Sequence, residues 1–153
     1  MQVKLRNSYG LHGCSCRELV TATILVLDVG AANISSLSSL STSEKIQETT
    51  ADGKQEHIVL SNQNKPCGIV VDHTAGRMFW ACMGSFGKED GAVYSANLNG
   101  SDIQTLIASG KINTPKQLSI DRVAGRLYFS DREGVRFYRC NVDSSGPGDS
   151  DLK

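Results

Sequence analysis

The sequence predicts an all-β protein made of repeated four-stranded antiparallel units, and two observations carry that prediction. Between residues 114 and 146, three short apolar runs (118–120, 126–129 and 135–140) are each closed by Asp, Ser or Asn. Runs of this length bounded by turn residues are typical of strands rather than helices. Residues 66–80 also align without a gap with residues 115–129, at an offset of 49 residues. Self-similarity at such a period indicates a repeat architecture.

The repeated residues resemble a known family. The pattern A-G-R-[LM]-[YF]-[WF]-x-[DC] occurs at 75–82 and at 124–131, with P-x-G-[IL]-x-[VI]-D before the first copy and A-N-L-[DN]-G-S after it. This is similar to the YWTD repeat, also called the low-density-lipoprotein-receptor class B repeat, and to its intracellular-type members in microbes and fungi. The resemblance covers roughly residues 24–146. It implies blades of a six-bladed, TolB-like β-propeller.

The repeats divide the chain into a partial propeller. We expect a non-repeat leader at 1–22, an incomplete first blade at 23–61 and a complete second blade at 62–110, followed by a third blade at 111–143 without its last strand and a polar tail at 144–153. In the first blade, 24–28 and 33–37 are expected as the second and third strands, and 38–51 as a Ser/Thr-rich insertion. Such a chain cannot close a six-bladed ring alone. It is therefore expected to be a fragment or, alternatively, to assemble with other copies.

Composition narrows the possible partners and the compartment. The formal net charge of zero gives no electrostatic reason to expect nucleic acid or an anionic membrane as a partner. Residues 1–20 lack the apolar core of a signal peptide, and the apolar run at 24–27 is too short to span a membrane. The five cysteines form no CxxC pair and indicate no disulfide framework, so we expect a reducing, cytoplasmic location.

The repeat motif supplies residues that we expect to be structural. Aspartates close equivalent strands, where a carboxylate can accept hydrogen bonds from turn N–H groups, and aromatic residues fill strand interiors. These residues are Asp28, Asp72, Trp80, Asp121, Tyr128 and Asp131. Gly76, Gly100 and Gly125 stand where hairpin turns need a positive φ.

Catalytic, cofactor and metal sites are not expected. His12, Cys14 and Cys16 could form half of a zinc site, but no second cluster accompanies them. His57 and His73 have no nucleophile at the spacing of a catalytic triad. The sequence thus favours a non-enzymatic module for protein interaction or self-association through exposed blade edges. The alternative is the remnant of a gluconolactonase-like hydrolase, whose metal would need Glu, Asn and Asp ligands from inner strands that here are mostly apolar.

One turn is the best candidate for recognition. The segment 83–91 is five residues longer than its counterpart in the next repeat, and loops on a rigid sheet are common recognition elements. It offers Phe86, Lys88, Glu89 and Asp90, and the shorter turn with Arg132 and Glu133 is expected on the same rim. The alternative is that this loop is only a solvated hairpin extension.

Overall fold

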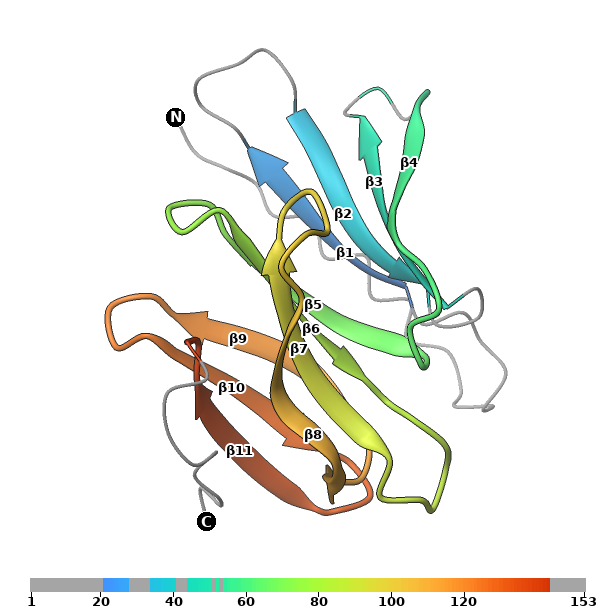
Figure 1. Cartoon of the computed structure of the whole chain (residues 1–153), viewed down its shortest axis with the longest axis vertical. Helices are drawn as coiled ribbons and strands as arrows, with labels where there is room; N and C mark the ends of the chain where they lie inside the picture. Colours follow the sequence, from blue (N-terminus) through green and yellow to red (C-terminus); the bar gives the residue numbers. More distant parts are fainter. Residues whose placement is uncertain (1–20, 28–33, 41–43, 51, 53, 144–153) are drawn as a thin grey trace.

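The computed structural model describes residues 21–27, 34–40, 44–50, 52 and 54–143, and it places them in three antiparallel sheets. The first sheet contains β1 (Thr21–Leu27), β2 (Ile34–Leu40), β3 (Lys45–Thr50) and β4 (Glu56–Leu60) in chain order. The middle sheet contains β5 (Pro66–Asp72), β6 (Arg77–Cys82), β7 (Gly91–Asn97) and β8 (Gln104–Ile112), and the third contains β9 (Pro115–Asp121), β10 (Arg126–Asp131) and β11 (Arg136–Asn141). Figure 1 shows the sheets following one another in sequence order. The predicted all-β architecture of four-stranded antiparallel units is confirmed.

The first sheet differs from the expected one. Within residues 38–51, β2 ends and β3 runs in full, paired on both sides, so 38–40 and 45–50 belong to the sheet and not to an insertion. The expected second and third strands fall instead on β1 and β2, the first two strands of a four-stranded sheet. Serine, which fills most of β2, carries no strong strand signal, and cross-strand pairing overrides such weak local preferences. Asp28 lies outside the described residues.

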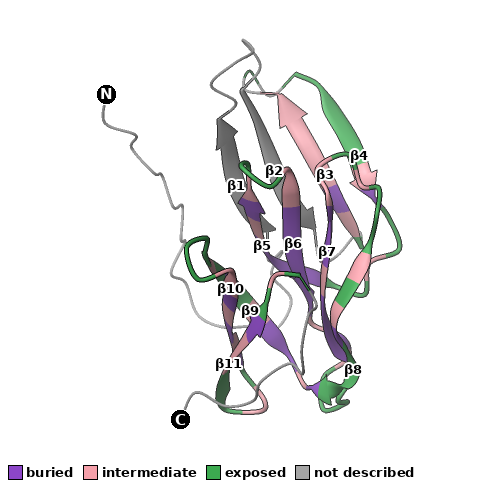
Figure 2. Cartoon of the chain, turned by 60° about the vertical axis from the view of Figure 1, so that its left-hand side comes forward, coloured by how far each residue is buried: buried purple, intermediate pink, exposed green. Residues whose placement is uncertain are grey.

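Apolar side chains on both faces of the middle sheet form the core. Met78, Trp80 and Cys82 face the first sheet and pack with Ile46 and Leu60. The alternate residues of the middle-sheet strands face the third sheet and pack with residues of that sheet. This second cluster is formed by Phe79, Ala81, Val93, Ile107, Ile112, Leu118, Leu127, Phe129 and Cys140. Figure 2 shows the buried residues concentrated on β5, β6 and β7. This two-sided burial explains why β6 is a continuous apolar run instead of an alternating one.

The inner strands of neighbouring sheets approach closely. Gly68 on β5 lies so near the backbone of β9 that a Cβ there would collide with the carbonyl O of Lys116. A glycine at this position therefore lets the middle and third sheets meet at their inner strands.

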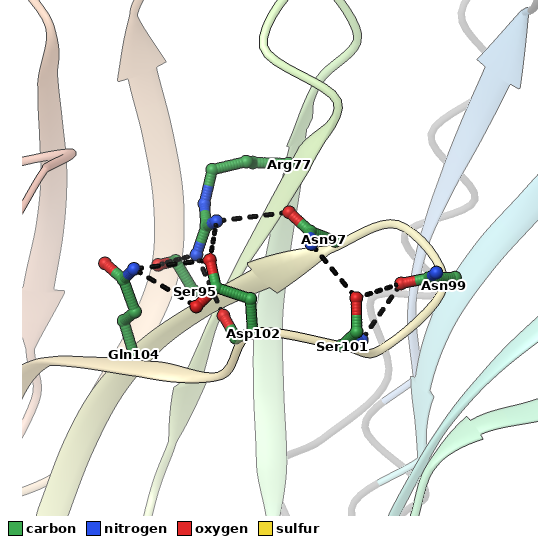
Figure 3. Close-up of polar contacts among 7 residues, drawn as sticks. All are labelled: Arg77, Ser95, Asn97, Asn99, Ser101, Asp102 and Gln104. Carbon is green, nitrogen blue, oxygen red and sulfur yellow. Dashed lines mark hydrogen bonds and ion pairs between the residues drawn. The ribbon is translucent and has the colours of Figure 1, made fainter.

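Polar contacts hold the turn between β7 and β8, at the opposite end of the sheet from the 83–91 loop (Figure 3). The Arg77 guanidinium donates to Asp102 Oδ2 at 2.7 Å, to Asn97 Oδ1 at 3.2 Å and to Ser95 Oγ at 3.0 Å. Asn99 Oδ1 accepts from the backbone N–H of Ser101 at 3.0 Å. The hydrogen bond from Arg77 holds the pKa of Asp102 below its ordinary value. Gly100 adopts φ 81° in this turn, as its predicted role requires.

Trp80→Ala tests the core. The side chain is 0% exposed, stacks on Tyr94 with ring centroids 5.6 Å apart, and donates its indole N–H to Gln63 Oε1 at 2.9 Å. We expect the free energy of unfolding to fall by about 3–5 kcal/mol, because the lost side chain leaves a cavity between two sheets. Thermal denaturation followed by circular dichroism measures this. Phe86→Ala, at a site 80% exposed, is the control and should leave the melting temperature unchanged. A Trp80→Ala variant that melts with the parent would contradict the assigned core.

Candidate functional site

The two candidate recognition segments lie on the same rim, on either side of one crossover. The loop 83–90 follows β6, the turn 132–135 follows β10, and the crossover 113–114 joins β8 to β9 between them (Figure 1). Gly91, at the end of the loop, packs so tightly on the crossover that a Cβ would collide with the carbonyl O of Asn113. On the other side, Asp131 accepts hydrogen bonds from the backbone N–H groups of Asn113 at 2.8 Å and Thr114 at 2.7 Å. We call this edge, made of 61–65, 83–90, 113–114 and 132–135, the crossover rim.

Internal hydrogen bonds brace the loop 83–90. Asp90 Oδ1 accepts from the backbone N–H of Ser85 at 2.6 Å, and the Lys88 N–H donates to the Ser85 carbonyl O at 3.1 Å. The Ser85 N–H holds the pKa of Asp90 below its ordinary value. Gly84, with φ 66°, makes room for this carboxylate. Asp90 therefore shapes the loop.

The tip of the loop is left open to solvent. Phe86 is 80% exposed, and Lys88 and Glu89 are exposed beside it. The base is fixed as well, because the Gly110 N–H donates to the Glu89 carbonyl O at 2.6 Å. A braced loop thus presents an aromatic ring next to one cation and one anion, a combination suited to recognising protein surfaces.

The neighbouring turn 132–135 carries an ion pair and a strained residue. Arg132 donates from Nε to Glu133 Oε1 at 2.6 Å. Burial favours a raised pKa for Glu133, but the hydrogen bond from Arg132 and the nearby Thr114 hydroxyl outweigh it and lower that pKa. The Thr114 contact lacks ordinary hydrogen-bond geometry, since Thr114 Oγ1 and Glu133 Oε2 are buried without such a bond among the described residues. Val135 is 87% exposed at φ 51°, an unfavourable backbone conformation for a β-branched side chain.

The repeat aspartates lie at turns and accept backbone hydrogen bonds there. Asp72 Oδ1 accepts from Thr74 at 3.0 Å and Ala75 at 3.3 Å, and Asp121 Oδ1 accepts from Val123 and Ala124, both at 3.0 Å. Only Asp131 among these three is buried, at 2% exposure, and it accepts a third bond from Gly134 at 3.2 Å. These carboxylates hold backbone in place and show no catalytic arrangement.

Cys82 occupies the position in the middle sheet that Asp131 occupies in the third. Burial raises the pKa of its thiol to about 12, so the group is neutral near pH 7. The neutral thiol meets the backbone N–H of Asn64 in the 61–65 crossover, but it is a weaker hydrogen-bond acceptor than the Asp131 carboxylate is for 113–114. The sequence alignment displays this substitution, but its effect on the crossover becomes visible only in the structure.

The described residues provide no separate chemical centre. No three His, Cys, Asp or Glu side chains within the described ranges gather as metal ligands. In the same part of the chain, no helix has the length and apolar character needed to cross a membrane. The candidate site is therefore the surface of the crossover rim.

Comparison with known proteins identifies relatives over the repeat region. The chain is 44% identical over 101 residues to a 3-hydroxyacyl-CoA dehydrogenase-like protein, LAM1, of Cochliobolus heterostrophus, covering 66% of this chain and 21% of that protein. It is 46% identical over 99 residues to low-density lipoprotein receptor-related protein 1 of Pyricularia oryzae, covering 62% and 32%. The chain thus spans about a fifth to a third of the length of these relatives. No family model matches.

A solved structure shares the fold. A chain in the crystal structure of a nidogen/laminin complex superposes with a TM-score of 0.65 at 21% sequence identity, covering 74% of this chain and 42% of that one. At this identity the likeness concerns the fold.

Asp131→Ala tests whether the buried carboxylate secures the crossover rim. Removing it leaves the N–H groups of Asn113, Thr114 and Gly134 without their acceptor, so we expect a loss of about 1–3 kcal/mol of unfolding free energy. Asp121→Ala removes an exposed turn carboxylate and should cost about 0.5 kcal/mol or less. Urea denaturation of both variants gives the comparison. Equal losses would show that Asp131 is an ordinary turn residue.

Proposed function

The chain belongs to the YWTD, or low-density-lipoprotein-receptor class B, family of β-propellers, and we propose that it acts as a non-enzymatic module for protein interaction. The observation that carries the proposal is the braced loop 83–90, which holds Phe86 at 80% exposure in the same loop as the exposed Lys88 and Glu89. An exposed aromatic ring on a pre-ordered loop loses little conformational entropy on binding. One solved neighbour is a complex of nidogen with laminin, which supports protein binding as a use of this fold.

The crossover rim suggests what such a partner would offer. Phe86 needs an apolar pocket, and Val135, also exposed on this rim, adds apolar surface. Lys88 and Glu89 would be matched by charges of opposite sign around that pocket. A polar rim around a small apolar centre is the usual anatomy of a reversible protein interface.

Enzymatic function is not part of the proposal. The dehydrogenase-like name of one relative belongs to a protein of which this chain spans 21%. A gluconolactonase-like hydrolase would need a metal-ligand set, and the described residues bring together no such group.

We also propose that the protein works in a reducing, cytoplasmic setting. Cys82 and Cys140 are buried free thiols. Burial raises the pKa of both, so these thiols are in the neutral and less reactive form near pH 7. Free buried cysteines are compatible with folding where disulfides do not form.

A site-specific photo-crosslinker tests the rim. In cells that naturally make the protein, benzoylphenylalanine at position 86 should capture a partner, and Lys88→Glu in the same chain should reduce that capture about tenfold or more through charge reversal. The matched control carries the crosslinker at Val123, an exposed residue in the turn after β9, at the opposite end of the sheets. Identical products from positions 86 and 123 would argue against a specific site on the crossover rim.

Self-association through a blade edge is a second proposed interaction. Within the described residues, β11 pairs with β10 on one side only, and Phe137 on this strand is 64% exposed. Strand edges next to exposed apolar side chains favour pairing with another chain.

Phe137→Lys tests that edge. We expect the parent protein to bind the dye ANS and to lose solubility at tens of micromolar, and the variant to be more soluble because an edge lysine opposes strand addition. Circular dichroism should show the same β content for both. A parent that is a soluble monomer without ANS binding would contradict edge association.

A further inference from the structure

The turn between β7 and β8 contains an asparagine whose side chain can react with the backbone that follows it. Asn99 precedes Gly100, and the sequence has no other Asn-Gly pair. Because glycine has no side chain, its backbone nitrogen can approach the preceding carboxamide without steric hindrance. Asn99 is exposed, and Figure 3 shows it at the tip of the turn.

The carboxamide oxygen of Asn99 has two hydrogen-bond donors, both from Ser101. The Ser101 N–H donates to Asn99 Oδ1 at 3.0 Å, and the Ser101 hydroxyl donates to the same oxygen at 2.6 Å. The hydroxyl in turn accepts from Asn97 Nδ2 at 3.0 Å, and the bonds of such a chain strengthen one another. Negative charge develops on Oδ1 when a nucleophile attacks Cγ of Asn99, so these donors are placed to stabilise that charge.

Asn97 and Asn99 lie in the same turn but differ in how their carboxamides are held. Among the described residues, Asn99 Nδ2 has no hydrogen-bond partner. In Asn97, by contrast, Oδ1 accepts from Arg77 at 3.2 Å and Nδ2 donates to Ser101 Oγ. The residue after Asn97 is Leu98, whose side chain hinders approach of its backbone nitrogen. The turn therefore contains one reactive asparagine and one protected asparagine.

We propose that Asn99 is a site of spontaneous deamidation in the folded protein. The backbone nitrogen of Gly100 attacks Cγ of Asn99 and forms a cyclic succinimide. The proton of that nitrogen and the –NH2 group of the carboxamide leave together as ammonia. Solvent water then opens the ring at either of its two carbonyl carbons, which gives aspartate or isoaspartate at position 99.

One contact opposes this reaction. The Gly100 N–H donates to the Asn97 carbonyl O at 2.9 Å, so this bond must open before the nitrogen can attack. The turn is exposed, and exposed turns open locally far more often than sheet cores do. The rate therefore depends on the opening of this bond and on the donors that remain on Asn99 Oδ1.

The two products differ in their effect on the turn. Aspartate keeps both hydrogen bonds from Ser101 and makes them charge-assisted, which strengthens them. Isoaspartate carries the chain through the former side chain and adds a carbon to the backbone before Gly100. Gly100 has no room to shift, because even a Cβ on it would lie 2.7 Å from the Val59 carbonyl O of β4. We expect isoaspartate to displace the turn from β4.

Displacement of the turn weakens the junction between the first and middle sheets. Leu98, in the same turn, packs against the cluster that contains Leu60 of β4 and Met78 of β6. The cluster between the middle and third sheets contains no residue of this turn. The effect of isoaspartate is therefore expected at one of the two sheet junctions only.

Peptide mapping by mass spectrometry tests the reaction in the whole chain after prolonged incubation at neutral pH. Aspartate and isoaspartate should form at position 99, while Asn97 stays unchanged. Enzymatic methylation of isoaspartate by a protein-isoaspartate methyltransferase counts that product separately. Asn99→Gln should form neither product, because glutamine would close a larger and less favourable ring. Absence of both products at position 99, or their formation only in the urea-unfolded chain, would overturn the proposal.

Ser101→Ala and Ser101→Thr distinguish this arranged turn from ordinary Asn-Gly chemistry. Loss of the hydroxyl should slow deamidation about two- to tenfold, the effect of one lost hydrogen bond on a rate. Threonine keeps a hydroxyl and should restore the parent rate. Circular dichroism of each variant establishes that it is folded. An equal or faster rate in Ser101→Ala would exclude a role for the Ser101 hydroxyl in the reaction.

Hydrogen–deuterium exchange measures the structural consequence. Ion-exchange chromatography isolates the deamidated protein by its added negative charge, and the Asn99→Asp chain is the control that carries aspartate alone. Faster exchange is expected in 56–60 of the deamidated protein than in the control, with equal exchange in 115–121. Equal exchange in both segments would contradict the predicted loosening of the first junction.

Discussion

The structure depends on the burial of β6 from both sides. Met78, Trp80 and Cys82 contact the first sheet, while Phe79 and Ala81 contact the third, and all five are nearly inaccessible to solvent. Burial of such side chains contributes about 1.5–3 kcal/mol for each large one. Because the two faces of a strand alternate, no residue of β6 can serve both neighbours, and each junction needs its own set of apolar side chains. The middle sheet consequently stabilises the sheets on both sides of it.

The polar residues at the two ends of the sheets have a different task, which is to direct the chain from one sheet to the next. Asp131 secures the crossover into β9 with a carboxylate, and the Arg77 cluster secures the turn between β7 and β8. The base of the loop 83–90 packs on the crossover 113–114, which Asp131 holds in place. The loop can therefore extend into solvent from a fixed base. The proposed recognition residues of the loop 83–90 are thus held by a backbone that is itself hydrogen-bonded to side chains.

The sequence predicted the middle and third sheets well because their residues repeat. Prolines, glycines and aspartates recur at an offset of 49 residues, and each marks the start of a strand, the end of a strand or a turn. The first sheet was predicted less well, since Ser-Ser-Leu-Ser-Ser-Leu in β2 lacks the alternation that identifies a half-buried strand. The structure supports β2 through its pairing with β1 and β3, a non-local interaction that no sequence window contains.

The sequence also predicted one part of the candidate site and missed another. The extra length of the 83–91 turn was visible in the repeat alignment, and so was the exposed group around Phe86. The bracing role of Asp90 and the contact of Thr114 with Glu133 were not visible, because both depend on how loops fold back in space. Residue type alone also gave no reason to expect Val135 at a positive φ.

The position of Trp80 makes the two sheet junctions spectroscopically distinct. The chain has a single tryptophan, and its indole lies in the junction between the first and middle sheets, hydrogen-bonded to Gln63 of the crossover. Its emission therefore reports on water entering that junction. The other junction contains Tyr138, stacked on Phe129 with ring centroids 5.4 Å apart. Separation of the third sheet would expose Tyr138 and leave the tryptophan environment intact, so unchanged tryptophan emission during partial unfolding identifies the third sheet as the part that has separated.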